Sequence, residues 1–422
     1  MKKLVLSLFS VLVLAGSVTT NAQEIENQIV VENRVNDPKQ FDKPYVILIS
    51  ADGFRYDYAK KYEATNLLNF AKSGIEAKAM YPSFPSITFP NHYTIVTGMY
   101  PIHHGLVGNS MLDVATGERY SLGNAKAVTN AKWYGGTPIW NLAEKNKMIS
   151  ACYYWPGSEA PINGILPTYS YKYSEKSPID FRIQQVVNWL ELPEDKRPHL
   201  ITFYFPEVDH AGHSFGPDSQ ETKEAVHFID QSIKKLNDEV AKTGLNVNFV
   251  FVSDHGMTRI DDENPLKLPI KIDDTKVQVV YNGSYVSLFI KDKTDIESVY
   301  NQLKAVKTNQ FEVYKTTDVL AKYNFNAKDD RLGRIGEIIL IAHAPNYFSN
   351  HNAPKGSHGF FVKETPEMKA TFMAWGPNFK SGKVIKPFEN IQIYPMLAKI
   401  LGLPIEDKID GNNQLANKIL KK

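Results

Sequence analysis

The sequence of 422 residues is poor in cysteine and has almost no imbalance of charge. Its one cysteine, Cys152, cannot form an intramolecular disulfide, so we expect it to be a small buried apolar residue. The formal net charge is only +2, and residues 1–22 carry two lysines and no acids, so the remainder is neutral. Proteins that bind nucleic-acid polymers usually present a strongly basic face, and we expect no such binding here.

Long hydrophobic runs are also missing, except at the start of the chain. Lys2 and Lys3 precede an apolar run over residues 4–15, and a small, polar stretch then ends at Ala22. This run is shorter than the roughly 20 residues of a membrane-spanning helix, and its plan is that of a secretory signal peptide over residues 1–22. We therefore expect an exported protein, periplasmic or extracellular, with no integral membrane segment in the mature chain.

What the chain does contain is a set of short, continuous apolar runs typical of strands buried on both faces. These runs lie at residues 45–49, 200–205, 247–252 and 370–375. Amphipathic helical patterns occur between them at residues 179–191 and 219–242, and Asp218 is the expected cap of the second. This alternation predicts an α/β fold with a mostly parallel central sheet and helices on both of its faces.

Residues 259–345 have a different pattern, which predicts an inserted small α/β subdomain. Strand-like pieces at 277–281 and 285–290 are followed by a helix-like stretch at 296–306. The expected organisation begins with a signal peptide (1–22) and a linker (23–43). The first part of the α/β core (44–258), the insertion (259–345) and the last part of the core (346–422) follow.

Acidic and histidine residues lie close to the ends of these predicted strands. The set consists of Asp52, Asp209, His213, Asp254, His255 and His358. Ligand sites in open parallel sheets lie beyond the carboxyl ends of the strands, so we expect these residues to converge. A set of three aspartates and three histidines suits zinc, with manganese or iron as weaker candidates. Six ligands divide into two sites of three, and each site keeps an open position for substrate or water.

A candidate nucleophile lies in the turn-rich segment over residues 81–93. Thr88 lies in this segment, which runs into a helical pattern over residues 93–98, and the positive potential at a helix start favours an anionic oxygen and a bound phosphate. Ser86 is the weaker alternative. A threonine that only caps the helix is the default interpretation of any isolated threonine at such a position.

Together these motifs resemble the nucleotide pyrophosphatase/phosphodiesterase family of the alkaline phosphatase superfamily, in a bacterial secreted form. The matching segments occur in the family's order and are LISADGFR (48–55), PSITFPNHYTIVTG (85–98), YYWPGS (153–158), DHAGH (209–213), SDHG (253–256) and SHG (357–359). The resemblance spans residues 43 to 415. It implies an alkaline-phosphatase-like fold, two zinc ions per chain and a small-molecule nucleotide substrate.

The resemblance also implies a role for each site residue. One zinc would be held by Asp52, Thr88, Asp254 and His255, and the other by Asp209, His213 and His358. Asn109 matches an amide that donates to a phosphate oxygen. Phe89 and Tyr173 match an aromatic pair that sandwiches a nucleobase, with Tyr169 and Tyr171 as neighbours that could take the place of Tyr173.

The implied reaction is a double displacement through a phosphothreonine diester on Thr88. It would release nucleoside 5'-monophosphates from nucleoside triphosphates, dinucleotides and nucleotide diesters. Residues 102–112 and 150–160 contain no lysine or arginine, which favours a diester over the more highly charged monoester. The residues after Thr88 also lack the pattern of a sulfatase.

Two alternatives remain open. Tyr153, Tyr154, Trp155 and Glu159 would suit a choline-type headgroup, so a lipid-headgroup phosphodiesterase of the same superfamily stays possible. A secreted binding protein without activity is a remote alternative, because every expected ligand is present in the sequence.

Overall fold

The computed structural model describes residues 27–319 and 321–421, so the predicted signal peptide lies outside the described residues. In the described part of the chain, nine strands form the central sheet. Their order is β1 (Ile29–Val30), β8 (Tyr169–Ser170), β7 (Ser150–Tyr153), β9 (Leu200–Phe205), β2 (Tyr45–Ala51), β10 (Val247–Val252), β17 (Phe372–Trp375), β3 (Ile75–Ala77) and β18 (Lys383–Ile385).

The strands from β8 to β10 are parallel to one another, which confirms the mostly parallel sheet. Strand β17 is antiparallel to β10, a direction that the apolar run at 370–375 did not indicate. The predicted linker over residues 23–43 is not wholly a linker, because β1 pairs antiparallel with β8 through Ile29 and Ser170. Cys152 lies fully buried in β7, as expected.

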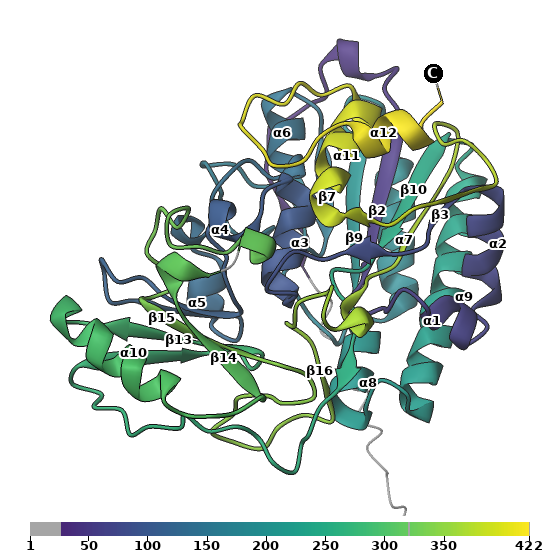
Figure 1. Ribbon diagram of the computed structural model, residues 1–422. Coiled ribbons are helices and arrows are strands. Elements are labelled where there is room, and N and C mark those ends of the chain that lie inside the picture. Colours follow the sequence, from purple (N-terminus) through teal and green to yellow (C-terminus); the bar gives the residue numbers. More distant parts are fainter. Residues whose placement is uncertain (1–26, 320, 422) are drawn as a thin grey trace, which may run out of the picture.

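Alternate residues of β2 pack against different helical layers, which explains why this strand is apolar throughout. Val46 and Leu48 belong to the core shared with α3 (Thr88–Thr97), α6 (Ile139–Lys145) and α11 (Ile393–Leu401). Ile47 and Ile49 belong to the core shared with α2 (Thr65–Ser73), α7 (Ile179–Leu190) and α9 (Gln220–Lys242). Helices therefore cover both faces of the sheet (Figure 1), and each such buried side chain contributes about 1.5–3 kcal/mol.

Helix α9 shows where a local sequence pattern misplaced a helix cap. The residue that caps it is Ser219, whose hydroxyl accepts a hydrogen bond from the backbone N–H of Thr222 at 3.1 Å. Asp218, the expected cap, instead pairs with Lys61. Both residue types favour the N-cap position, so the choice depends on where the chain turns after Gly216.

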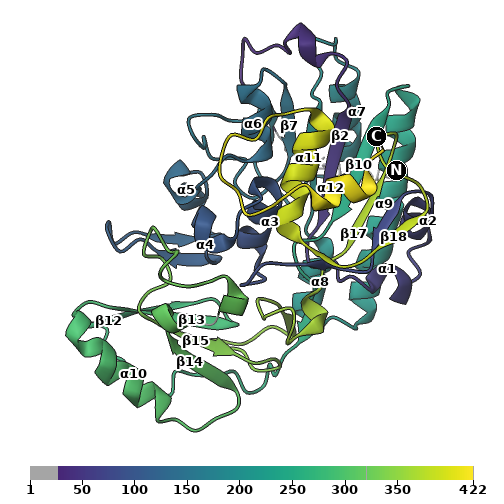
Figure 2. The same cartoon turned by 45° about the horizontal axis from the view of Figure 1, so that its top comes forward.

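A second sheet of four strands in the described chain lies beside the core, at the lower left of Figures 1 and 2. Its antiparallel order is β12 (Val277–Tyr281), β13 (Tyr285–Ile290), β15 (Ile338–Ala342) and β14 (Phe311–Lys315), and α10 (Ile296–Lys304) packs against it. Buried Arg334 joins this region to the core by donating to the carbonyls of Gly105 at 2.6 Å and Trp133 at 2.9 Å. The domain boundaries expected from the sequence stay a prediction.

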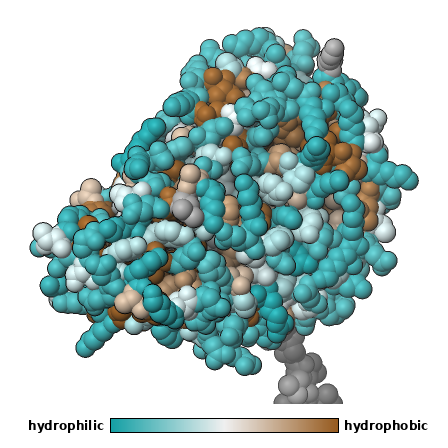
Figure 3. Space-filling model, in the orientation of Figure 1, coloured by the Kyte–Doolittle hydropathy of each residue, from teal (hydrophilic) through white to brown (hydrophobic). Residues whose placement is uncertain are grey.

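Shorter elements complete the fold around the sheet. They are α1 (Tyr58–Lys61), α4 (Pro101–His104), α5 (Ala125–Val128), α8 (Glu207–Phe215), α12 (Gln414–Ile419), β4 (Met80–Tyr81), β5 (Ser110–Leu112), β6 (Arg119–Ser121), β11 (Thr258–Arg259), β16 (Gly356–Ser357) and β19 (Phe388–Glu389). The face in Figure 3 is mostly hydrophilic, with separate apolar areas. Within residues 27–319 and 321–421, every helix is too short or too polar to cross a membrane.

Candidate metal centre and active site

The predicted ligands meet beyond the carboxyl ends of three adjacent parallel strands. Asp52 directly follows β2, and Asp254 and His255 follow β10. Helix α8, which begins soon after β9, carries Asp209 and His213. His358 arrives from a distant part of the chain, directly after β16, which lies against α8.

One tight group consists of Asp52, Asp254 and His255, with one ligand atom from each lying within 4.8 Å of the others. His255 Nε2 lies 3.0 Å from Asp254 Oδ2 and 3.5 Å from Asp52 Oδ1. The hydroxyl of Thr88 lies 3.3 Å from the same nitrogen. The candidate nucleophile therefore stands at the edge of this group.

A second tight group consists of Asp209, His255 and His358, so His255 belongs to both. His213 is outside the two groups but adjoins the second, since its Nε2 lies 3.1 Å from His358 Nε2 and 3.4 Å from Asp209 Oδ2. The rings of His255 and His358 are stacked with their centroids 3.6 Å apart. All seven predicted ligand residues are thus brought together.

Backbone carbonyls fix the orientation of the three histidines. The Nδ1 atoms of His213, His255 and His358 lie 2.8 Å, 2.9 Å and 3.0 Å from the carbonyl oxygens of Gly356, Gly256 and Ser86. A carbonyl oxygen can only accept, so each Nδ1 carries a proton, and in the neutral imidazole each Nε2 then has a lone pair for a metal ion. Metal-binding histidines are usually held in this way.

The carboxylates have unused acceptor capacity that a cation would satisfy. Among the described residues, the buried Oδ1 atoms of Asp52 and Asp209 accept no hydrogen bond. Burial, together with the nearby carboxylates of Asp254 and Asp209, raises the pKa of Asp52 well above its ordinary value. Buried unpaired charges are costly, so three carboxylates and three Nε2 lone pairs fit divalent cations.

The loop after β2 depends on Gly53. Its φ of +65° is in the left-handed region, and an added Cβ would lie 3.0 Å from the Cα of Asp209. Its N–H donates to Asp254 Oδ1 at 3.3 Å. Glycine therefore allows the loops of Asp52 and Asp209 to approach closely.

The hydroxyls of Thr88 and Ser86 have different surroundings. Thr88 is the first residue of α3 and faces His255. The buried Ser86 hydroxyl donates to the carbonyl of Phe360 at 2.7 Å and accepts from the N–H of Gly359 at 3.1 Å. Ser86 therefore supports the loop of His358, while the hydroxyl of Thr88 borders the ligand groups.

Asn109 and the aromatic residues flank this centre. Asn109 Oδ1 accepts from the N–H of Phe89 at 3.1 Å, which leaves its amino group to donate elsewhere. Tyr173 is 43% exposed, whereas Tyr169 and Tyr171 are buried. Tyr173 is therefore the one of these three tyrosines that offers substantial ring surface to a ligand.

Two residues at the centre were not assigned a role from the sequence. Tyr204 on β9 donates from its hydroxyl to Asp52 Oδ2 at 2.5 Å. His92 on α3 lies 2.8 Å from the hydroxyl of Ser50 through Nε2 and 3.2 Å from Asp254 Oδ2 through Nδ1. A tyrosine within a buried apolar strand needs a partner for its hydroxyl, and this was the available signal for Tyr204.

Comparisons with known proteins agree with this arrangement. The profile of the type I phosphodiesterase / nucleotide pyrophosphatase family matches residues 46–361. The chain is 33% identical over 382 residues to an uncharacterized pyrophosphatase/phosphodiesterase of Schizosaccharomyces pombe, covering 86% of this chain and 77% of that protein. It is 32% identical over 398 residues to ectonucleotide pyrophosphatase/phosphodiesterase family member 3 of Rattus norvegicus, covering 91% of this chain and 45% of that protein. The chain thus spans less than half of the rat relative's length.

A solved structure of murine ectonucleotide pyrophosphatase / phosphodiesterase 5 is similar in fold, with a TM-score of 0.82 and 26% identity. The similarity covers 89% of this chain and 100% of the murine chain. Another structure of the murine protein, an inactive threonine-to-alanine form in complex with AMP, also has a TM-score of 0.82, with 25% identity, and covers 90% of this chain and 100% of that chain.

Proposed function

The chain belongs to the type I phosphodiesterase / nucleotide pyrophosphatase family, and we propose that it hydrolyses phosphodiester and phosphoanhydride bonds in nucleotides. The products are nucleoside 5'-monophosphates. The observation that carries this proposal is the convergence of three aspartates and three histidines, with the hydroxyl of Thr88 at the edge of the group.

We assign Asp52, Thr88, Asp254 and His255 to one zinc ion. Asp209, His213 and His358 are assigned to a second. The fit rests on the lone pairs of the three oriented histidines and on the buried Oδ1 atoms of Asp52 and Asp209. When bound, zinc ions supply Lewis acidity, which stabilises oxygen anions and lowers the pKa of a coordinated hydroxyl or water.

Thr88 is the proposed nucleophile, and a phosphothreonine diester is the proposed intermediate. The position of Thr88 at the start of α3 places its hydroxyl in the positive potential of the helix N-terminus. Ser86 is a poorer candidate because its hydroxyl is engaged by two backbone groups. That the murine relative with one threonine replaced by alanine is described as inactive accords with a threonine in this role.

Asn109 is proposed to donate to a phosphate oxygen, since its Oδ1 is held by Phe89 and its amino group is left to serve the substrate. Such a donor stabilises charge that develops on the oxygen during attack. Water then hydrolyses the phosphothreonine and regenerates Thr88.

A nucleotide is favoured over a lipid headgroup as the substrate. Tyr173 offers an exposed ring that can stack on a base together with Phe89, and the murine relative binds AMP. The aromatic side chains that would form a choline cage, those of Tyr153, Tyr154 and Trp155, are buried. Glu159 is engaged as well, because its Oε1 accepts from the N–H of Tyr173 at 3.0 Å.

Export is proposed together with this activity. Residues 1–22 have the composition of a signal peptide, and similar proteins include an ectonucleotide pyrophosphatase/phosphodiesterase and a venom phosphodiesterase of Naja atra.

A substrate panel tests the proposed activity. The purified protein is given a nitrophenyl ester of thymidine 5'-phosphate, ATP, glycerophosphocholine and nitrophenyl phosphate, and the products are identified by chromatography. We expect nucleoside 5'-monophosphates from the first two compounds and little turnover of the others. Preference for glycerophosphocholine would favour the headgroup alternative, and turnover of none would favour a protein without this activity.

A further inference from the structure

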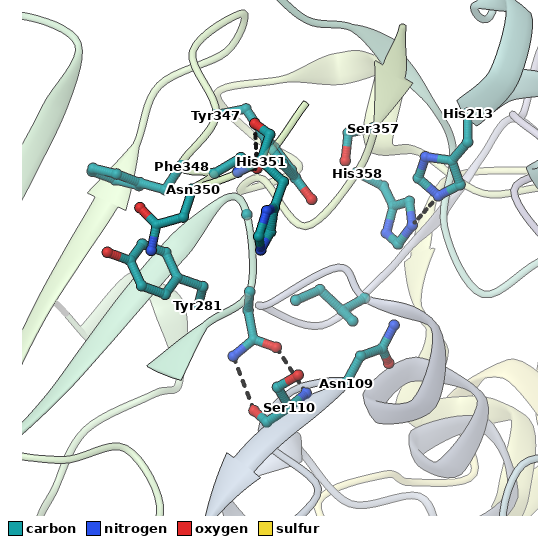
Figure 4. A pocket seen from close by; sticks show the side chains of 14 residues that line it. Asn109, Ser110, His213, Tyr281, Tyr347, Phe348, Asn350, His351, Ser357 and His358 are labelled. Atoms are coloured by element: carbon teal, nitrogen blue, oxygen red, sulfur yellow. Dashed lines mark hydrogen bonds between the residues drawn. The ribbon is translucent and has the colours of Figure 1, made fainter. Parts of the chain in front are cut away.

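A cavity of about 400 Å³ opens where the small sheet meets the core. Asn109, His213 and His358 line it from the core, and Tyr281, Asn350 and His351 line it from the strand end and loop of the small sheet. Figure 4 shows these two sets of side chains on either side of the cavity. Its volume is within the range of roughly 300–1,000 Å³ that is usual for small-molecule sites.

The cavity borders the centre at His213 and His358, and it also reaches Ile87, the residue before Thr88. Thr88, Asp52 and Asp254 are not among its lining residues, whereas His213 and His358 are. In phosphoryl transfer the attacking and leaving oxygens lie roughly in line with phosphorus. Because Thr88 Oγ1 lies beside His255, we expect a group that it displaces to depart toward His213, His358 and the cavity.

The wall contributed by the small sheet is held firmly against the core. Asn282 Oδ1 accepts from the N–H of Ser110, and Asn282 Nδ2 donates to the Ser110 carbonyl, both at 3.0 Å. Gly283 has a φ of +74°, and an added Cβ would lie 2.0 Å from the ring of Tyr347. These contacts indicate a cavity that exists before any ligand binds.

The described side chains that line the cavity are largely polar, and none of them is permanently charged. Among the described residues that line the cavity, none is a lysine, arginine, aspartate or glutamate. The ammonium group of Lys267 lies near the rim but donates to the carbonyl of Ser349 at 2.6 Å. Phosphate anions are bound most strongly by cationic side chains, whereas amides and hydroxyls pair well with uncharged hydroxyls.

We propose that this cavity is the leaving-group subsite and that it receives an uncharged, hydroxyl-bearing sugar ring rather than pyrophosphate. This inference rests on the proposed function. The favoured substrates are then nucleoside 5'-phosphates esterified to a sugar hydroxyl, as in dinucleoside monophosphates. The phosphorus–oxygen bond to the sugar breaks, the sugar oxygen gains a proton, and water supplies the hydroxyl that completes the 5'-monophosphate.

The test compares kcat/KM for the dinucleoside monophosphate ApA, the methyl ester of AMP and ATP, each relative to the unsubstituted enzyme. Comparison within each substrate removes the difference in intrinsic leaving-group reactivity. The double variant Asn350→Ala/His351→Ala removes two exposed polar side chains from the lining. We expect kcat/KM for ApA to fall by about fivefold or more, in line with lost hydrogen bonds, while the methyl ester is unaffected.

A charge-addition variant gives the opposite signature. Asn350→Lys places an ammonium group at the cavity, and we expect it to raise kcat/KM for ATP while lowering it for ApA. Asn352→Lys is the matched control, because Asn352 is exposed in the same loop but does not line the cavity. This control should change the ratio of kcat/KM for ATP to kcat/KM for ApA by less than about twofold, because charges exposed to solvent are screened.

The outcomes separate this inference from the activity on which it rests. If the unsubstituted enzyme cleaves none of the three substrates, the proposed function fails and this inference with it. If all three are cleaved but the double variant affects them equally, the cavity is not the leaving-group subsite and the proposed function stands. The same conclusion follows if Asn350→Lys and Asn352→Lys have equal effects.

Discussion

The hydroxyl of Tyr204 donates a hydrogen bond of 2.5 Å to Oδ2 of Asp52. The two residues are 152 positions apart in the chain, but they lie on the adjacent parallel strands β9 and β2 or directly after them. The bond leaves Oδ1 of Asp52 facing His255 at 3.5 Å. Tyr204 thus fixes the orientation of a proposed metal ligand.

Removing this hydroxyl should weaken metal binding without unfolding the protein. We expect Tyr204→Phe to lower zinc affinity by about 10- to 100-fold, the usual effect of removing a group that orients a ligand. Competition with a chromogenic chelator measures the change. The control is Tyr58→Phe, which removes a buried hydroxyl that donates to the carbonyl of Pro217. Equal zinc affinity in the Tyr204 variant and the unsubstituted enzyme would show that Asp52 does not need this bond.

The nucleophile can be assigned by a pair of alanine variants. Thr88→Ala should lower kcat by about a thousandfold or more, because loss of a nucleophile removes the covalent route. Ser86→Ala should keep most of the activity. It should cost about 1–3 kcal/mol of folding stability, since backbone groups of Gly359 and Phe360 lose their partner. The reverse pattern of activities would transfer the role to Ser86.

Base recognition should depend on the exposed ring of Tyr173. Stacking contributes roughly 1–3 kcal/mol per base in single-strand binders, so Tyr173→Ala should raise the KM for nucleotides by about tenfold. A small diester without a base should be cleaved as before. Phe228→Ala, at another exposed aromatic residue on α9, is the control. If the Tyr173 variant loses both substrates equally, its role is structural.

Folding stability should respond to pH through the pair of His103 and Asp410. Nδ1 of His103 lies 2.7 Å from Oδ2 of Asp410. The hydrogen bond to Asp410 raises the pKa of His103 above its ordinary value of 6.5. Burial would raise the pKa of Asp410, but the bond from His103 lowers it below 3.8.

The direction of the effect follows from these two shifts. The folded chain holds the His103 proton more tightly, so this stabilisation is complete below about pH 6.5 and is lost as the pH rises through the raised pKa. The Asp410 contribution is lost only at acidic pH. The Tm difference between the unsubstituted protein and His103→Gln should therefore be larger at pH 5.5 than at pH 9. An equal difference at both pH values would contradict the pairing.

Features encoded by continuous apolar runs were predictable from the sequence. Strands β9 and β10 have the bounds expected from their runs, because buried parallel strands are apolar throughout. A helix was also expected after the turn-rich segment, over residues 93–98, although it begins earlier, at Thr88. The convergence of Asp52, Asp209 and Asp254 followed from the rule that strand ends of a parallel sheet share one edge.

Features set by pairing between distant segments were not predictable in this way. The antiparallel direction of β17 depends on the path of the chain between strands, which its apolar run does not encode. The partner of Tyr204 depends on the register of β9 against β2. The contact of His213 with His358 needs the loop of Ser86 and Gly359 to bring His358 back to α8.

The measurement that tests the two-metal account most directly is a zinc titration of the metal-free enzyme with activity and bound metal followed together. Turnover of the nitrophenyl ester of thymidine 5'-phosphate should be absent without metal and should rise to a break at about two equivalents per chain, since three carboxylates and three histidines exceed one tetrahedral site. Asp209→Ala and His358→Ala should each bind about one equivalent, because both remove a ligand of the same proposed site. Full activity of the metal-free protein, or a break at one equivalent, would contradict the account.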